Sequence, residues 1–383
     1  MIPGEERGPA ESVVEDETGV APEVYEGKLS PRVAPWGVLS RLVRILLLLV
    51  SLYLFVVAIE LVKAGASGAA SLVETLIDIN SVPNALGFGW LATYLVMSGS
   101  PVAAVSVAFL ATGAVSRLAA FAMIIGSRLG ASFIVLFIGF VYVLRGHERR
   151  TGLSMGLLSL VVTATVYLPA MALGAVLLTY GWLDVVQFEQ GTALNSVLDR
   201  LVAPLVDPVA GALPGWAIML VGLVVLWVSF YLFDRVLPDL DLESSRFSQV
   251  ARLVYRPLVM FILGAVLTLL TLSVSLSLSL LVPLSARGYV RRENAIPYIM
   301  GANITTFLDT LLATVLLGSA DALSVVLVSM TSVTLISLLV LLLVFRPYQR
   351  LTLGVVEWAA SSNRNLILFM GTILGVPLIL ILI

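Results

Sequence analysis

The chain has 383 residues, of which 59% are hydrophobic and only 12% are charged, and its mean hydropathy is +1.05. Soluble proteins carry roughly 25% charged residues, so the composition excludes an ordinary soluble domain and indicates a polytopic membrane protein. There is no cysteine and one histidine, His147, which excludes disulfides, cysteine-ligated metals and histidine-rich metal sites. The net charge of −2 points to no particular partner, and we expect no nucleic-acid partner.

The first 36 residues differ from the rest of the chain. They are rich in Glu, Pro, Gly and Val and show no sustained periodicity, which predicts a disordered tail. The segment is acidic and lacks an apolar core, so it is not a secretory signal peptide. We expect residues 1–36 to form a cytoplasmic tail.

Nine apolar segments follow the tail, and several exceed the ~20 residues that a helix needs to cross a bilayer. The alternating pattern of a membrane barrel is mostly missing, so the expected fold class is an all-α polytopic membrane protein. The segments lie at about 38–62, 84–115, 117–144, 153–181, 214–236, 253–285, 294–318, 322–345 and 364–383.

Positive charges orient these segments, because loops rich in Lys and Arg stay in the cytoplasm. Arginines gather before the first span, near 145–150, between 235 and 256, at 287–292 and near the C-terminus. The stretch 182–213 instead carries four acidic residues and one arginine. We expect a plasma-membrane protein with a cytoplasmic N-terminus and an extracellular loop at 182–213.

This orientation leaves too many segments for the available crossings. Segments 84–115 and 117–144 both lie between the outer end of the first span and the cytoplasmic loop near 145, and two full crossings would return the chain outside. Segment 84–115 contains the turn-like run Ser98-Gly99-Ser100-Pro101, so we expect it to be a re-entrant helix hairpin, buried in protein or lining a cavity. Segment 253–285 lies between two cytoplasmic stretches and should be re-entrant too.

A shift of 175 residues aligns the two halves of the chain without a gap. The expected first repeat spans 37–181 and the second 214–345, followed by a C-terminal segment, 346–383, with a final membrane helix. Because the first repeat begins inside and the second outside, they should be inverted repeats, as in many secondary transporters that bind substrate at the repeat interface. The matched small or polar residues are Gly89 and Gly264, Thr93 and Thr268, Ser98 and Ser273, Ser100 and Ser275, Gly113 and Gly288, Arg117 and Arg292, and Gly126 and Gly301.

The break in segment 84–115 predicts the start of a half-helix. Proline is common at the first position of a helix, and serine is common at the capping position just before it. We therefore expect a helix beginning at Pro101 with Ser100 as its cap. Its free N–H groups suit an anion, and the hydroxyls of Ser98 and Ser100 suit sodium. The alternative is a plain proline kink with small residues that pack helices together.

The matching stretch "TLSVSLSLS" spans residues 271–279. Residues two apart on a helix point to nearly opposite sides, so Ser273 and Ser275 can face one site only if the backbone unwinds there. The alternative is that these serines bond back to carbonyls of their own helix.

A second polar element is "GANITTFLDT" at 301–310, which the shift places on "GSRLGASFIV" at 126–135. Ionisable groups inside a membrane are costly and are therefore functional candidates. Arg128, which falls on the position of Asn303, could clamp an anion, and Asp309 could bind sodium or carry a proton. A buried Arg128–Asp309 pair that locks the repeats together is the alternative, and it is compatible with a site beside it.

Enzymatic chemistry finds little support. A nucleophilic serine needs a base, and the single histidine lies in the charged loop "RGHERR". The sequence contains no metalloprotease helix motif, phosphate-binding loop motif or dinucleotide motif. We expect the protein not to be an enzyme.

The two motif pairs resemble those of the type II sodium–phosphate cotransporter family. That family has a Gln-Ser-Ser-Ser motif in each repeat, followed by a motif like Gly-Ala-Asn-Ile-Gly-Thr. Here "MSGS" (97–100) and "LSVS" (272–275) stand at the first motif, while "GANITT" (301–306) matches the second well and "GSRLGA" (126–131) poorly. The glutamines are replaced by Met97 and Leu272, the middle serines by Gly99 and Val274, and the first asparagine by Arg128.

The resemblance implies sodium-coupled symport of inorganic phosphate or a similar small anion by alternating access, with sodium as the coupling ion. Proton coupling, another solute, or a non-transporting protein that keeps the fold are the alternatives, and a homodimer stays open. Six residues are expected to bind sodium: Ser98, Ser100, Ser273, Ser275, Asn303 and Thr306. The substrate or ion site is expected to include these residues and Thr93, Gly99, Ser127, Arg128, Thr268, Thr305 and Asp309.

Overall fold

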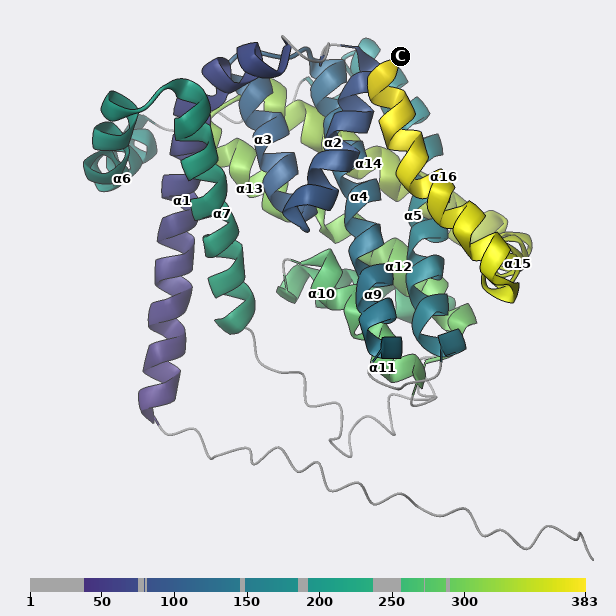
Figure 1. Ribbon diagram of the computed structural model, residues 1–383. Helices are drawn as coiled ribbons and strands as arrows, with labels where there is room; N and C mark the ends of the chain where they lie inside the picture. Colours follow the sequence, from purple (N-terminus) through teal and green to yellow (C-terminus); the bar gives the residue numbers. More distant parts are fainter. Residues whose placement is uncertain are drawn as a thin grey trace, which may run out of the picture. The chain divides into compact units, whose positions relative to one another are not determined.

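A computed structural model describes residues 38–74, 79, 81–144, 149–184, 192–236, 256–271, 273–286 and 290–383. The expected tail at 1–36 lies outside these residues, as does Leu272. Contacts divide the chain into residues 1–43 and 44–383, and the packing described below is that of the second unit. Throughout the described ranges all regular structure is helical (Figure 1), which confirms the predicted all-α class.

Seven stretches of the described helices are long and apolar enough to cross a membrane. They support a multi-pass membrane protein, because each contains at least the roughly 17–20 residues that a spanning helix requires. They belong to α1 (Val38–Glu74), α4 (Arg117–Leu144), α5 (Arg149–Thr179), α7 (Gly215–Val236), the consecutive α12 (Arg292–Thr305) and α13 (Phe307–Leu317), α14 (Ala320–Leu343) and α16 (Asn363–Leu382).

The two remaining apolar segments form only short helices. Segment 84–115 divides into α2 (Val82–Val96) and α3 (Gly99–Ala111), and segment 253–285 into α9 (Pro257–Thr271), α10 (Val274–Ser279) and α11 (Leu281–Ala286). The longest of these helices has 15 residues, which corresponds to about 22 Å. That length is below the ~30 Å of a hydrocarbon core, so none of them can cross alone.

The stretch expected as a loop at 182–213 contains a helix instead, α6 (Thr192–Ala212). Val202 and Val206 lie four residues apart and are buried beside Val57 of α1, whereas Asp207 is exposed. Residues four apart share one helix face, so α6 is amphipathic. The prediction missed it because its acidic residues suggested a solvated loop, although the apolar spacing was already present in the sequence.

Helices α2 and α4 pack through glycines. Gly89 lies against the backbone of Met123, and Gly126 lies against the carbonyl of Leu86. A Cβ added at either glycine would overlap the facing backbone. The close approach of these two helices therefore requires glycine at both positions.

Helices α9 and α12 pack through the equivalent positions, each 175 residues further along the chain. Gly264 lies against the backbone of Tyr298, and Gly301 lies against the carbonyl of Phe261. Both glycines are buried and leave no room for a Cβ. The shift that aligns the two halves of the sequence therefore also aligns their backbone contacts.

Helices α2 and α3 form an antiparallel hairpin beside α4 (Figure 1). Thr93, near the end of α2, packs against Gly130 of α4, so α2 runs parallel to α4. Gly99, at the start of α3, faces Ser127 and Ala131, and α3 then returns toward the first residue of α4. The tip of the hairpin thus lies beside the middle of α4, and both of its ends lie near the start of α4.

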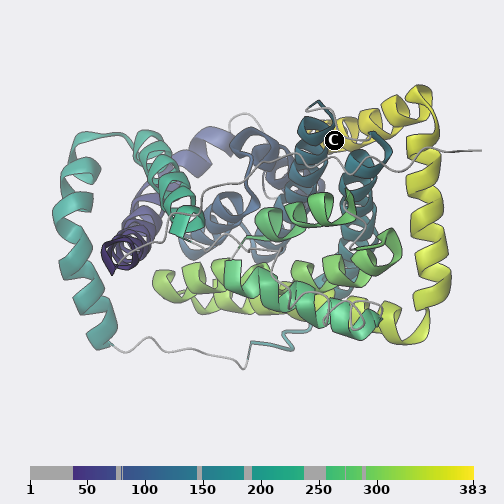
Figure 2. The same cartoon turned by 90° about the horizontal axis from the view of Figure 1, so that it is seen from below.

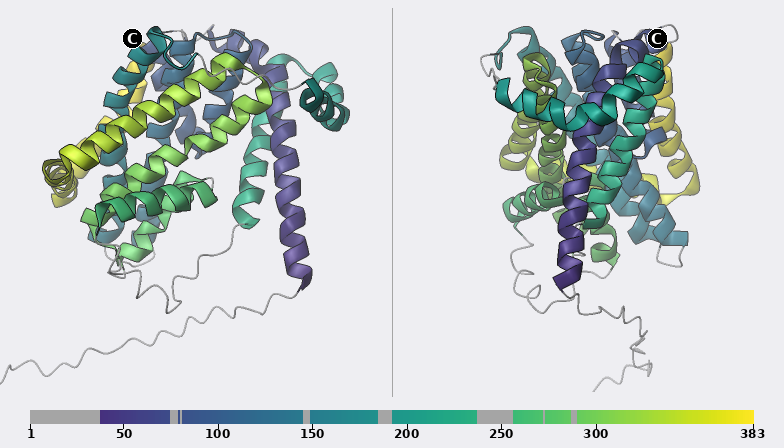
Figure 3. Two further views of the ribbon diagram at one scale, coloured as in Figure 1. Left: turned by 180° about the vertical axis from the view of Figure 1, so that it is seen from behind. Right: turned by 90° about the vertical axis from the view of Figure 1, so that its left-hand side faces the viewer.

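Helices α1 and α7, which the same shift relates, pack side by side (Figure 3). Gly65 lies against the backbone of Met219, and the Ser229 hydroxyl donates to the carbonyl of Ser51 at 2.8 Å. Residue numbers rise along α1 as they fall along α7, so the two helices are antiparallel. In the second half, α13 and α14 pack together.

Two helices follow the second half, α15 (Phe345–Ser361) and α16. Helix α15 packs on α5, and α16 packs on α2 (Figure 2). The exposed arginines Arg346 and Arg350 lie near the start of α15. The C-terminal segment thus covers helices of the first half.

Candidate functional site

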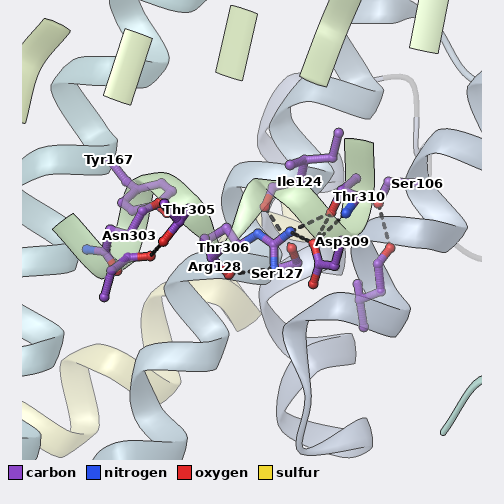
Figure 4. A network of polar contacts seen from close by, with 12 residues as sticks. Ser106, Ile124, Ser127, Arg128, Tyr167, Asn303, Thr305, Thr306, Asp309 and Thr310 are labelled. Carbon is purple, nitrogen blue, oxygen red and sulfur yellow. Dashed lines mark hydrogen bonds and ion pairs between the residues drawn. The ribbon is translucent and has the colours of Figure 1, made fainter. Parts of the chain in front are cut away.

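A buried ion pair joins α4 to α13 (Figure 4). Arg128 Nη2 lies 3.0 Å from Asp309 Oδ1, and the two residues are 3% and 5% exposed. The guanidinium also donates to the Thr306 hydroxyl at 3.2 Å and to the Thr310 hydroxyl. The ring of Phe307 lies 5.2 Å from the guanidinium carbon. The Arg128–Asp309 pair that the sequence offered as an alternative is therefore present.

This network leaves one polar atom of each charged partner without a hydrogen bond in the described part of the chain. These atoms are Arg128 Nε and Asp309 Oδ2, and both are buried. Asp309 lines a small cavity of about 40 Å³ that Ser51 and Ser229 also border. A buried polar atom without a partner is unfavourable, so each half of the ion pair has capacity for one more ligand.

Helix α4 and the α12–α13 segment run in opposite directions past the ion pair. Arg117, at the start of α4, donates to the Ser324 hydroxyl at 2.9 Å and lies 3.8 Å from Asp321; both partners are at the start of α14, just after α13 ends. Arg128, later in α4, pairs with Asp309, which comes before Asp321 in the chain. The 175-residue shift relates α4 to the α12–α13 segment, so these equivalent stretches run antiparallel where the ion pair joins α4 to α13.

Asn303 lies in the same buried layer but bonds to α5. Its side-chain nitrogen donates to the Thr163 hydroxyl at 3.2 Å, and its backbone carbonyl accepts from the Tyr167 hydroxyl at 2.7 Å. Tyr167 is fully buried, and its ring stacks on Phe307 at 6.0 Å. Phe307 in turn faces Arg128, so the asparagine and the ion pair lie on either side of one aromatic pair.

The start of α3 differs from the prediction by two residues. The helix begins at Gly99 with Ser98 as the N-cap residue, so Ser100 is not the cap, and Ser98 makes no side-chain cap hydrogen bond. Pro101 still lies in the first turn, where an N–H would have no helical partner anyway. Gly99 is buried against the Ser127 carbonyl. The hairpin tip therefore contacts the residue that directly precedes Arg128 in α4.

Ser273 lies between the end of α9 and the start of α10, close to the predicted unwinding at Ser273 and Ser275. Ser273 is half-buried, and the side chain of Ser275 lies outside the description. Thr268 donates to the Ser277 hydroxyl at 2.8 Å, and Ser277 shares a 2.8 Å hydrogen bond with the Tyr298 hydroxyl. Thr268 therefore stabilises the packing of α9, α10 and α12 rather than contacting the ion pair.

Three other predicted site residues satisfy backbone carbonyls. Ser127 donates to Ile124 of its own helix at 2.7 Å, Thr93 to a carbonyl of its own helix at 2.9 Å, and Thr305 to Ala265 of α9 at 2.9 Å. Such bonds are typical of hydroxyls in membrane helices. Of the six residues expected to bind sodium, the described contacts join Thr306 alone to the ion pair.

The network also includes residues that the sequence analysis did not select. Thr310 contacts both Arg128 and Asp309, and its position next to Asp309 could have suggested it. Tyr167 and Thr163 lie on α5, outside both motifs, and only the packing of α5 against α12 reveals them.

No family model, curated protein or solved structure matches the chain. The resemblance to sodium–phosphate cotransporters therefore rests on the motifs in the sequence.

Proposed function

We propose that the protein is a secondary transporter of the plasma membrane that moves a small anion, with inorganic phosphate as the first candidate, together with a cation by alternating access. One observation carries this proposal: two halves with the same glycine contacts meet at a buried ion pair, and their equivalent helices run antiparallel. Inverted repeats with broken helices are the architecture of many secondary transporters.

In this proposal the two broken segments are re-entrant hairpins. The α2–α3 hairpin enters and leaves beside the start of α4, and its tip reaches the level of Ser127. The Thr268–Ser277 bond likewise folds α10 back on α9. Because α4 and α12 run in opposite directions, the two hairpins would open toward opposite faces of the membrane. Non-helical backbone at that depth requires protein or a wet cavity to satisfy it, and at the first tip Gly99 is buried against the Ser127 carbonyl.

The anion would bind between the tip of the first hairpin and Arg128. The N–H groups of Gly99, Ser100 and Val102, in the first turn of α3, have no partner within the helix, and the helix dipole attracts negative charge there. The half-buried hydroxyls of Ser98 and Ser100 lie at this end. Arg128 Nε, which is buried without a partner, offers one further donor. Arginine is well suited to hold phosphate through paired hydrogen bonds.

Coupling to a cation follows from the electrostatics of the ion pair. In the structure, Asp309 neutralises Arg128, and an incoming anion would compete with this carboxylate for the guanidinium. Removing the partner of a buried charge is unfavourable by about 3–5 kcal/mol. A cation bound at Asp309 Oδ2, which is buried without a partner, would restore neutrality. Anion and cation would therefore enter together.

Sodium is the first candidate for this cation, as the motif resemblance implies, and a proton is the second. The observation that favours the proton is that Asp309 is a single carboxylate with one free oxygen, which is sufficient to hold a proton.

Uptake of labelled phosphate into proteoliposomes tests the proposal. We expect an inward sodium gradient to drive uptake, a potassium gradient of equal size not to, and Ser100→Ala to reduce it. If a pH gradient drives uptake instead, the cation is a proton. Asp309→Asn should abolish coupling, whereas Asp321→Asn, at an exposed aspartate, should not.

A folded protein that moves no small anion under either gradient would contradict the proposal. It would favour the second candidate function, a non-transporting protein in which Arg128 and Asp309 only hold the halves together. The observation in favour of that candidate is the number of partners that Arg128 already has in the structure: Asp309, Thr306 and Thr310.

A further inference from the structure

A second, larger cavity of about 430 Å³ lies away from the ion pair, between α2, α4, α5 and α16. Small-molecule sites span about 300–1,000 Å³, so this cavity is large enough for a ligand. All four helices line it, with residues that include Trp90, Ser132, Ala164, Thr165, Leu168 and Ile373.

The lining of this cavity is apolar, and its few hydroxyls are already bonded. Ser132 donates to the Leu129 carbonyl at 2.7 Å, Thr165 to the Val161 carbonyl at 2.6 Å, and Thr372 to a carbonyl of its own helix at 2.9 Å. The indole N–H of Trp90 donates to Tyr94 at 2.7 Å. These side chains therefore offer a polar ligand no free hydrogen-bond donor, and water does not fill an apolar cavity of this kind.

The cavity lies among helices that can span a membrane. Three of its four walls, α4, α5 and α16, are helices long and apolar enough to span a bilayer. Only 11% of the apolar window of α16 is buried within the protein, and Leu168, on the cavity wall, is 50% exposed. The medium that meets this side of the bundle is therefore lipid hydrocarbon.

We propose that this cavity binds the acyl chain of a membrane lipid, held between α16 and the first half of the chain. Protein interiors are close-packed, and a void forfeits the dispersion contacts of its walls. An acyl chain restores these contacts and needs no hydrogen-bonding partner. This inference does not depend on the proposed transport function.

The bound chain would connect α16 to the re-entrant hairpin. Helix α16 packs on α2 directly, and Tyr94 donates to the carbonyl of Ile373 at 3.2 Å. The cavity adjoins this contact, since Trp90 and Ile373 both line it. A lipid there would support the same helix, α2, that carries the tip beside Arg128.

Tryptophan fluorescence tests this proposal. A protein with Trp90 as its sole tryptophan, made by changing the other five to phenylalanine, is placed in phosphatidylcholine with or without bromine on the acyl chains. Trp90 is only 8% exposed. We nevertheless expect about a twofold loss of its emission in brominated lipid, because a chain in the cavity contacts the indole. The five changed residues are Trp36, Trp182, Trp216, Trp227 and Trp358.

Two matched variants separate the cavity from the outer surface. Ala164→Phe fills the cavity from α5 and should abolish the quenching of Trp90, whereas Ala172→Phe, at an exposed position on the same helix, should leave it intact. In a protein whose sole tryptophan is Trp227, which is 49% exposed, brominated lipid should quench the emission with either Ala164→Phe or Ala172→Phe. Quenching of Trp227 without quenching of Trp90 would overturn the proposal, as would quenching of Trp90 that persists in Ala164→Phe.

Lipid retention gives a second measurement if Ala164→Phe does not fold. Ser132→Leu fills the cavity from the opposite wall, α4, and should release phospholipid that the wild-type protein retains through detergent exchange. Wild-type protein that carries no phospholipid after mild exchange would contradict the proposal. It would mean that α16 closes onto the cavity or that another apolar molecule fills it.

Discussion

The two halves of the chain share their packing but differ in their polar residues. Helix pairs α2–α4 and α9–α12 approach through glycines at positions 175 residues apart, with the same backbone partners. At the centre, however, Arg128 of the first half stands where the second half has Asn303, and Asp309 stands where the first half has Ile134. The shared part is therefore a scaffold of close backbone contacts, whereas the two charges lie at non-equivalent positions and pair with each other.

The broken segments differ as well. The first break contains glycine and proline, and a single helix of 13 residues follows it. The second break has neither residue in "TLSVS", and two helices of six residues each follow it. Helix α4 is continuous where α12 and α13 are interrupted at Thr306. The second half thus has more interruptions near the ion pair, and we expect it to be the more adaptable half.

The largest expected effect comes from making the two halves alike at the ion pair. Arg128→Asn copies the residue of the second half and leaves Asp309 buried without its partner. We expect the free energy of unfolding to fall by about 3–5 kcal/mol, measured by thermal or denaturant unfolding in detergent. Combining Arg128→Asn with Asp309→Ile removes both charges and should recover at least part of that loss. A double variant less stable than either single variant would contradict this account of the pair.

Matched glycine substitutions test the shared scaffold. Gly126→Ala and Gly301→Ala each place a Cβ against the backbone of the neighbouring helix, so we expect each to lower stability by about 1–3 kcal/mol. Gly354→Ala serves as the control, because nothing lies near its added Cβ. It should be neutral or slightly stabilising. If one of the two buried substitutions is harmless, the halves do not share the same packing constraint.

A smaller effect is expected at Asn303, whose equivalent position in the first half is occupied by Arg128. Tyr167→Phe removes the 2.7 Å hydrogen bond to the Asn303 carbonyl and should reduce stability by about 0.5–1.5 kcal/mol. Tyr180→Phe, at a tyrosine that is 73% exposed, should have no measurable effect. Equal melting temperatures for the two variants would show that the buried bond contributes little.

The smallest effect on stability is expected from Asp184, which lies just beyond the end of α5. Hydrogen bonds from Arg117 and then from Ser324 lower the pKa of Asp184 to about 2. Because the folded-state pKa lies below that of the unfolded chain, roughly 3.9, the stabilisation is complete above pH ~4 and is lost as pH falls toward 2. Asp184→Asn should therefore reduce the melting temperature at neutral pH and show a smaller difference from wild type near pH 2. Asp207→Asn, at an exposed site, is the control.

Local patterns in the sequence predicted much of this architecture. The helical class follows from composition, and the break near Ser98 follows from its turn residues. The break near Ser273 follows from the charge pattern and the 175-residue match, which compares sequence with sequence. The contacts of Tyr167 and Thr310 depend on which helices pack together and were not predicted. The two-residue error at the start of α3 has a similar origin, because Gly99 begins the helix where α4 allows its backbone to approach.

Cysteine labelling from each side of the membrane tests most directly whether the two halves have opposite orientations. The chain has no cysteine, so single substitutions need no altered background. Ser81→Cys and Ser116→Cys flank the first hairpin, and Arg256→Cys and Arg291→Cys flank the second. A membrane-impermeant maleimide should label the first two from outside and the last two from the cytoplasmic side alone. Labelling of Ser81→Cys and Ser116→Cys from opposite sides, or of all four from one side, would contradict the inverted arrangement.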